Sequence, residues 1–172
     1  MWFATAPTEL DFTTSSPHKL TFDAIVEARP ERVFDIFAKG EAQETWFQDL
    51  KAVRWNGPAP HGVGTTREVE LKLLTVKERF VAWEPGVRLA FSIDAITLPI
   101  VKRMMEDLQF EAVGEKGTRF VWTVHYEPAL VMKPLHPVAK LIFGKMFRAS
   151  LDGLVKYAAA HPHANDGAAG RG

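Results

Sequence analysis

The chain has 172 residues, of which 47% are hydrophobic and 24% charged, and its 21 basic side chains equal its 21 acidic ones. This composition is typical of one globular domain, and a net charge of zero gives no global field that would attract nucleic acid. Disulfides, thiolate metal sites and a cysteine nucleophile are excluded because there is no cysteine. The N-terminus lacks the basic start and apolar run of a signal peptide, and no apolar stretch reaches the roughly 20 residues that cross a bilayer, so we expect a cytoplasmic protein without membrane insertion.

The first third of the chain predicts an arm, a strand and two short helices. Residues 1–17 are rich in threonine, serine and proline and are interpreted as an N-terminal arm. Alternation then begins, with Leu20, Phe22 and Val26 on one face of a strand. Pro30 starts a helix, because the first turn does not need the missing N–H, and Gly40 ends it. A second helical turn over residues 41–47 carries Trp46.

The remainder predicts six strands and one long helix. Strands are expected over residues 50–55, 63–71, 73–83, 87–95, 106–113 and 118–127, each with one apolar and one polar face. From about residue 133 to 161 the apolar period becomes helical, which predicts a rod about 40 Å long. One apolar row of this helix contains Leu135, Val138 and Ile142, and we expect the helix to pack on the sheet. Residues 162–172 are interpreted as a disordered tail.

This element order, together with short motifs, resembles the START/Bet v 1-like superfamily, and in particular its polyketide cyclase/dehydrase-like branch. The residues that carry the resemblance are Ala28 to Phe34, Trp46, Gly62 to Thr65, Glu78 to Gly86, Arg88 to Phe91, and Gly117 to Arg119. The resemblance covers roughly residues 18–160 and implies an α+β helix-grip domain, over residues 18–161. In that fold a curved antiparallel seven-stranded sheet wraps around a long C-terminal helix, and two short helices follow the first strand. It does not imply one chemistry, since such relatives include carriers, receptors and cyclases.

A cavity is expected between the sheet and the helix, because a twisted sheet is concave and a helix is a straight rod about 10 Å wide. We expect it to bind a small hydrophobic molecule, such as a lipid or a polyketide-like aromatic compound. The alternative is that the aromatic rings simply fill the core. The candidate ligand-binding residues are Trp46, Trp55, Phe91, Ile93, Met104, Leu108, Phe110, Trp122, Tyr126, Phe143, Phe147 and Leu151.

A few polar side chains are candidates for catalysis. Glu106 is on the same face of its strand as Leu108 and Phe110, which we expect to point inward. There it could act as a general acid or base. The alternative is that it lies at the solvated start of the strand. Glu78 is either an inward acid or, as we favour, half of an ion pair with Arg67, Arg79 or Arg88. Tyr126 could bind a ligand carbonyl or make a structural hydrogen bond, and His125 is expected on the outer face. The six histidines show no metal-ligand spacing, and nucleotide-binding and catalytic-serine motifs are absent, so we expect no metal or cofactor.

The segment over residues 95–105 is apolar where a connection between strands should be polar, and Pro99 disfavours a central strand. It could form a methionine-bearing cover over the cavity, a contact in a homodimer, or packing under the long helix. Three functions follow as hypotheses. We favour a binder of a hydrophobic small molecule without evident catalysis. The others are a cyclase or dehydratase that uses Glu106, Glu78 or Tyr126, and a protein-interaction module that acts through residues 95–105.

Overall fold

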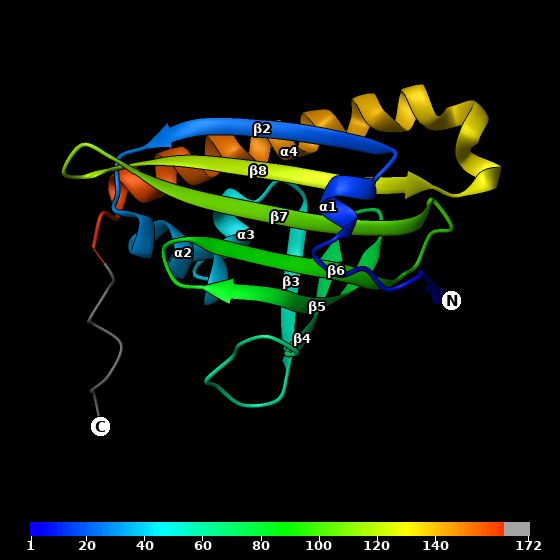
Figure 1. The fold of residues 1–172 in the computed structure, drawn as a ribbon, viewed down its shortest axis with the longest axis horizontal. Coiled ribbons are helices and arrows are strands. Elements are labelled where there is room, and N and C mark those ends of the chain that lie inside the picture. Colours follow the sequence, from blue (N-terminus) through cyan, green and yellow to red (C-terminus); the bar gives the residue numbers. More distant parts are fainter. Residues whose placement is uncertain (164–172) are drawn as a thin grey trace.

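The computed structural model describes residues 1–163 and consists of one curved sheet with a long helix lying across its concave face (Figure 1). Seven strands run antiparallel in the order β2-β8-β7-β6-β5-β4-β3, and the two-residue β1 pairs with β6. The strands are β1 (Phe3–Ala4), β2 (His18–Val26), β3 (Leu50–Asn56), β4 (Thr66–Leu71), β5 (Thr75–Glu84), β6 (Arg88–Ile96), β7 (Val101–Val113) and β8 (Gly117–Pro128). The predicted α+β helix-grip fold is confirmed.

The helices occupy the two ends of the concave face. α2 (Pro30–Ala38) and α3 (Gln43–Trp46) follow β2, and Pro30 stands at the start of α2 as predicted. The 3₁₀ helix η1 (Leu130–Leu135) leads into α4 (His136–Ala160), so the long helix starts three residues later than expected. Pro134 and Pro137 explain the change, because neither can donate the backbone bond that a continuous α-helix would need there. Of the tail predicted over residues 162–172, residues 164–172 lie outside the described part.

Several predicted boundaries were wrong, all of them next to turns. β7 begins at Val101, not at residue 106, so the connection between β6 and β7 shortens to residues 97–100, and Pro99 falls inside it. The strands predicted from residues 63 and 73 begin at Thr66 and Thr75. Apolar side chains continue the alternating pattern into these turns. The backbone hydrogen bonds that define where each strand ends cannot be read from the sequence, so the predicted boundaries were off by two to five residues.

The N-terminal arm packs on the outer face of the sheet (Figure 1). The short helix α1 (Phe12–Ser15) buries Phe12 in a small apolar cluster with Met105 and Ala90. His125 points to this outer face, as alternation predicts, but it is buried under the arm and hydrogen-bonded to Ser16 at 2.9 Å. The face that the sequence predicts to be wet is therefore partly covered.

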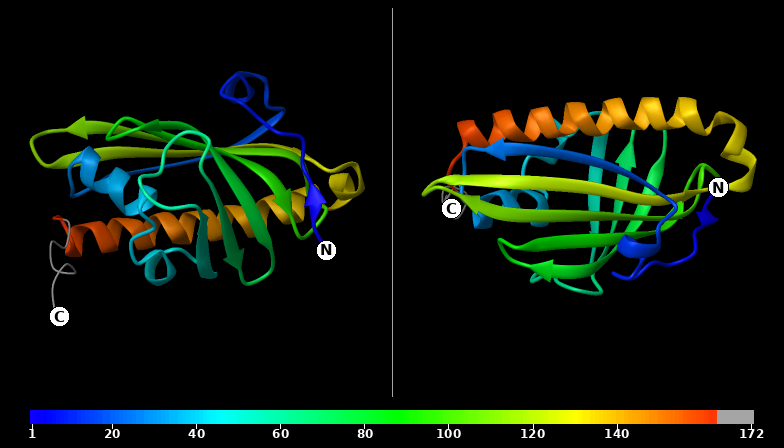
Figure 2. Two further views of the ribbon diagram at one scale, coloured as in Figure 1. Left: turned by 90° about the horizontal axis from the view of Figure 1, so that it is seen from below. Right: turned by 45° about the horizontal axis from the view of Figure 1, so that its top comes forward.

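The main core fills only one end of the concave face. Next to α2 and α3, rings stack edge to face, with Phe37 5.0 Å from Trp46 and 5.2 Å from Trp122 between centroids. The second half of α4 closes this end with Leu151 and Leu154, which are fully buried. The first half of α4 crosses the other end, where the sheet curves away from it (Figure 2).

One expectation about α4 was wrong. Leu135, Val138 and Ile142 were expected to belong to the rows that pack on the sheet, but they are 56%, 57% and 51% exposed. The side chains that turn inward from these turns are Ala139 and Phe143, which line the space below the helix. Apolar residues surround this part of α4 on all sides, so their spacing alone does not say which side faces the sheet.

Candidate functional site

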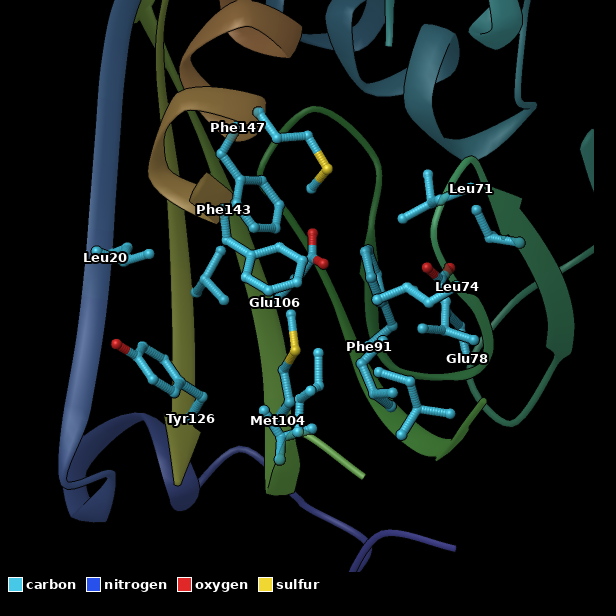
Figure 3. Close-up of a pocket in the computed structure, with 18 of the residues that line it drawn as sticks. Leu20, Leu71, Leu74, Glu78, Phe91, Met104, Glu106, Tyr126, Phe143 and Phe147 are labelled. Carbon is cyan, nitrogen blue, oxygen red and sulfur yellow. The ribbon is translucent and has the colours of Figure 1, made fainter. Parts of the chain in front are cut away.

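An apolar cavity of about 100 Å³ lies between the first half of α4 and the concave face of the sheet (Figure 3). A single water needs about 10 to 15 Å³ of such space, so the cavity has room for several waters or a small molecule. Sites for larger ligands are typically about 300 to 1,000 Å³. A molecule of several rings would therefore require the side chains of the mouth to move.

The structure separates the twelve predicted ligand-binding residues into two groups. Seven of them line the cavity, namely Phe91, Ile93, Met104, Trp122, Tyr126, Phe143 and Phe147. The remaining five, Trp46, Trp55, Leu108, Phe110 and Leu151, do not.

The second group lies in the filled end of the fold or at its edge. Leu108 and Leu151 are fully buried, and Phe110 packs against Phe34 with ring centroids 5.6 Å apart. Trp46 is buried against α2 and donates its indole N–H to the carbonyl of Glu41. Trp55 is half-buried, stacked 4.0 Å from the ring of His61. These five residues lie in the main core or pack against it, at the end where α2 and α3 dock.

A buried ion pair crosses from β4 to β5 at one wall of the cavity. Arg67 and Glu78 are paired in the sheet register, and the Nε of Arg67 donates to Glu78 at 2.5 Å. The guanidinium also lies 5.1 Å from the centroids of Trp55 and Phe80 and 5.4 Å from that of Phe91, so aromatic faces contribute to its stabilisation. Burial raises the pKa of Glu78, and the positive charge of Arg67 opposes that shift. The predicted ion pair is present, with Arg67 as the partner.

Glu106 reaches into the same cavity from β7 (Figure 3). It lies in the middle of the strand, because β7 starts five residues earlier than predicted, so the alternative of a solvated strand end was wrong. Burial raises the pKa of Glu106 to about 8, and the negative charge of Glu78 adds to this shift. The indole N–H of Trp122 donates to one carboxyl oxygen at 2.8 Å and opposes it. At neutral pH the side chain is therefore mostly a neutral acid with an O–H to donate.

Two buried polar atoms of residues in the cavity lining have no hydrogen-bond partner among the described residues. They are the Nη1 of Arg67, a donor, and the Oε1 of Gln43, an acceptor. Both residues line the cavity, and they are 1% and 2% exposed. Unpaired buried polar atoms are uncommon in folded proteins. We call the group Gln43, Arg67, Glu78 and Glu106 the polar end of the cavity.

The sequence could have revealed part of the polar end. Side chains alternate between the two faces of a strand, so Arg67 lies on the same inward face as Val69 and Leu71. A charged residue on an otherwise apolar face is a signal in the sequence for a buried polar group. Arg67 appears among the predictions only as a partner for Glu78. Gln43 gave no such signal, because its position depends on how α3 docks against the sheet.

The mouth of the cavity lies beneath η1 and the start of α4. The hydroxyl of Tyr126 and the Nε2 of His136 are 2.8 Å apart, so this hydroxyl already has a partner, as in the structural alternative. Burial raises the pKa of Tyr126 and lowers that of His136. From the segment 95–105, Ile96, Ile100, Val101 and Met104 line the cavity. This placement is compatible with a cover or with packing under the helix, while a homodimer contact stays a prediction.

Over residues 1–163, no group of three histidine, aspartate or glutamate side chains is arranged to hold a metal ion. None of the helices in this range combines the length and the apolar character needed to cross a membrane.

Comparison with solved structures supports the fold. The Zhui aromatase/cyclase of Streptomyces sp. R1128 superimposes with a TM-score of 0.73 at 14% identity, over 87% of this chain and 98% of that one. A protein of Thermus thermophilus gives a TM-score of 0.69 at 19% identity, over 85% of this chain and all of that one. Ginseng major latex-like protein 151, from Panax ginseng, gives 0.64 at 11% identity, over 81% and 96%.

Comparison of sequences identifies the family. An uncharacterized protein of Mycobacterium tuberculosis is 30% identical over 149 residues, which cover 86% of this chain and 89% of that protein. Residues 17–159 match the family described as polyketide cyclase / dehydrase and lipid transport. That match spans most of the chain, including the whole sheet except β1, and nearly all of α4. The chain therefore belongs to the polyketide cyclase/dehydrase and lipid transport family.

Proposed function

We propose that the cavity binds a small, mostly apolar molecule that carries a carbonyl or hydroxyl oxygen. The observation that carries this proposal is that Arg67 and Gln43, which line this mostly apolar cavity, each have a buried polar atom without a hydrogen-bond partner among the described residues. An unpaired buried polar group costs about 1 to 3 kcal/mol, so a ligand that pairs with both atoms recovers that free energy. Membership of the family supports a ligand-binding or cyclase-type function in general terms.

The charges at the polar end favour a neutral ligand over an anionic one. Glu78 already compensates the charge of Arg67, at 2.5 Å, and Glu106 is mostly neutral at pH 7 because its pKa is about 8. An added carboxylate would approach Glu78 at the polar end, where Arg67 is the cation and is already paired, whereas a carbonyl or phenol needs only hydrogen bonds. Arg67 would donate to the ligand oxygen, and Gln43 would accept a ligand hydroxyl.

The apolar body of the ligand would lie among the rings and methionines toward the mouth. Phe143 and Met104 are only half-buried there, and methionine adapts its shape readily. Movement of these two side chains would enlarge the cavity beyond its present volume, as a multi-ring or acyl ligand requires. The aromatic lining contributed by Phe91 and Trp122 suits a flat, unsaturated body.

A second function, a cyclase or dehydratase, is supported by the protonated state of Glu106. A buried acid with a pKa of about 8 is close to the pH at which a general acid works best. Glu106 would donate a proton to a hydroxyl that leaves as water, and the Glu78 carboxylate would take the proton from the carbon next to the carbonyl. The Nη1 of Arg67 would stabilise the negative charge that this proton removal places on the carbonyl oxygen. An enzyme of this kind needs a substrate that carries both a hydroxyl and a carbonyl group, whereas ligand binding alone requires only one of these groups.

Calorimetric titration with 2-naphthol and with naphthalene tests the proposed ligand class. These probes differ by a single hydroxyl, and we expect the protein to bind 2-naphthol at least roughly tenfold more tightly. Replacing Arg67 and Glu78 together by methionine, with Gln43→Leu added, removes the ion pair and both unpartnered atoms without leaving one charge unpaired. Glu106 remains in this variant, and we expect most of the preference for 2-naphthol over naphthalene to be lost.

Equal affinity of the unmodified protein for the two probes, or no uptake of either, would contradict the proposal. Both partners of the ion pair are replaced together, because a single Arg67→Met would leave the negative charge of Glu78 buried and uncompensated. For the enzymatic alternative, Glu106→Gln should abolish turnover of a hydroxy-ketone substrate while its binding persists.

A further inference from the structure

The outer side of η1 and of the first half of α4 exposes a cluster of large aliphatic side chains. Six of the fourteen exposed large apolar residues of the described chain fall within residues 130–142. We call this cluster the aliphatic face, and it consists of Leu130, Val131, Leu135, Val138, Leu141 and Ile142, which are 51% to 77% exposed. Single exposed apolar residues are common, but a contiguous cluster indicates a surface that contacts something else.

The aliphatic face lies on the border of the molecule, turned away from the sheet. Figure 2 shows α4 along one side of the molecule, with the sheet on its other side. The same two turns of the helix send Ala139 and Phe143 inward to the cavity. The apolar residues on the outside are therefore not explained by packing within the described chain.

Cations accompany this cluster, and carboxylates do not. Between Pro128 and Leu151 the chain contains Lys133, Lys140, Lys145 and Arg148, all exposed, and no aspartate or glutamate. The chain as a whole is neutral, so this is a local excess of positive charge. It was not apparent from the overall composition.

The acidic groups at the borders of the aliphatic face do not cancel this excess. Glu127 is already bound by Lys102 at 2.9 Å and by Arg103 at 2.7 Å. Asp152 follows Lys145 by seven residues, which is about two helical turns, and both line one groove beside β2. Asp49 lines another groove together with Lys145. Asp49 and Asp152 therefore offset only part of the positive charge, because the groove that contains Asp152 is lined by Lys140 and Arg148 as well as by Lys145.

We propose that the aliphatic face binds the surface of an anionic lipid bilayer. Aliphatic side chains of an interfacial helix enter the boundary between headgroups and acyl chains, and the lysines beside them attract the anionic headgroups. The helix lies on the surface in this arrangement and does not cross the membrane. The proposal concerns an interaction surface and does not require that the cavity holds a ligand.

Two other occupants fit the surface less well. A second copy of the chain would form a twofold interface, which places the same patch on both sides and brings Lys140 and Lys145 toward their own counterparts. Single-stranded nucleic acid is bound through aromatic side chains that stack on bases, whereas this face presents leucine, valine and isoleucine.

The position of this face relative to the cavity gives it a functional consequence. His136, Lys140 and Phe143 line the cavity from the same turns of α4 that carry Val138 and Ile142 on the outside. Docking on a bilayer would therefore place the mouth of the cavity beside the lipid. An apolar ligand could then pass between the membrane and the cavity without crossing bulk water, a consequence that rests on the proposed function.

Sedimentation with vesicles tests the proposal. We expect the protein to bind vesicles of equal parts phosphatidylglycerol and phosphatidylcholine at least roughly tenfold more tightly than vesicles of phosphatidylcholine alone, with binding that weakens as salt is added. The variant Val138→Glu with Leu141→Glu should lose roughly tenfold or more of this affinity. A matched control, Val63→Glu with Val87→Glu, changes two similarly exposed valines elsewhere and should bind like the unmodified protein.

A second pair of variants separates charge from apolar contact. Lys140→Gln with Lys145→Gln should weaken binding to the anionic vesicles and reduce its dependence on salt, whereas Lys51→Gln with Lys116→Gln should have a smaller effect. These exposed substitutions leave the core intact, and circular dichroism checks that each variant is folded.

Three results would overturn the proposal: no binding to the anionic vesicles, equal loss in the valine control, or a dimer in light scattering that Val138→Glu with Leu141→Glu dissociates. Titration with 2-naphthol in the absence of vesicles reports on the cavity separately. Failure of the lipid surface and failure of the proposed ligand are therefore distinguishable.

Discussion

At the scale of single residues, the most informative side chains are the charged ones that the fold buries. Arg67 is 1% exposed and is held by Glu78 and by three aromatic rings, yet one of its donors remains unpaired among the described residues. Glu106 lies in the same cavity and escapes the cost of a buried charge by keeping its proton. A core that served only stability would be expected to contain apolar residues at these positions.

The protonation of Glu106 predicts how stability depends on pH. Its pKa rises from 4.5 to about 8 on folding, so its contribution to stability is complete below pH 4.5 and is lost as the pH rises through about 8. In Glu106→Gln a neutral amide replaces the acid at every pH. We expect the unmodified protein to lose stability relative to this variant between pH 4.5 and 8, by up to roughly 1 kcal/mol per pH unit.

Chemical denaturation at a series of pH values measures this difference. The amide oxygen of the variant can still accept the indole N–H of Trp122, so the comparison isolates the titration of the carboxyl. Parallel stability profiles for the two proteins across this range would show that Glu106 is not buried as an acid.

At the scale of elements, α4 has two halves with different surroundings. Its second half is pressed against α3, and the first half bridges the cavity with one side exposed. Two glycines in the helix mark this difference. A methyl group at Gly153 would clash with the backbone carbonyl of Trp46, while a methyl group at Gly144 would have no neighbour within 4 Å.

This contrast predicts opposite effects for the same substitution. Gly144→Ala should raise the free energy of unfolding by about 1 kcal/mol, because alanine favours a helix more than glycine does. Gly153→Ala should lower it by about 1 to 3 kcal/mol, because α4 must move away from α3. Thermal or urea denaturation measures both. A stabilising Gly153→Ala would mean that the contact between α3 and α4 is looser than described.

At the scale of the whole molecule, one polar network connects the C-terminal end of α4 to α2 and to the loop between α2 and α3. Glu41 accepts two hydrogen bonds from Arg32, at 2.6 and 2.7 Å, and one from Tyr157 at 2.7 Å. Arg32 also donates to the carbonyl of His161 at 3.0 Å. The network anchors the helix at the filled end of the fold, whereas the opposite end of the helix spans the cavity.

Removing the charge of Glu41 should loosen this anchor. The hydrogen bond from Arg32 is the main cause that lowers the pKa of Glu41 to about 2, so its contribution to stability is present above pH 4.5 and is lost as the pH falls through about 2. We expect Glu41→Gln to lower the free energy of unfolding at pH 7 by about 2 to 4 kcal/mol and to flatten the loss of stability in acid. The exposed Glu44→Gln is the control and should change neither quantity.

Denaturation at pH 7 and at acidic pH measures both effects. If Glu41→Gln were as stable as Glu44→Gln, the hydrogen bonds of Glu41 with Arg32 and Tyr157 would not contribute to the attachment of α4.

The order and type of the elements follow from local patterns in the amino-acid sequence. Alternation, helical spacing and the helix boundaries at Pro30 and Gly40 are local signals, and the element order that they predict resembles the α+β helix-grip fold that the structure has. They also placed Glu106 and Phe91 on inward rows. These patterns can be recognised in the sequence because each depends on residues that are close together in the chain.

Which inward residues line a cavity and which fill the core depends on packing between distant segments. That division depends on where α2 and α3 dock, and it separates Phe143 and Trp122 from Phe110 and Trp46. The same is true of Gln43 in the polar end, and of the side of α4 that remains exposed. Each of these features joins segments distant in the chain, and a local pattern contains no information about which distant surface will cover it.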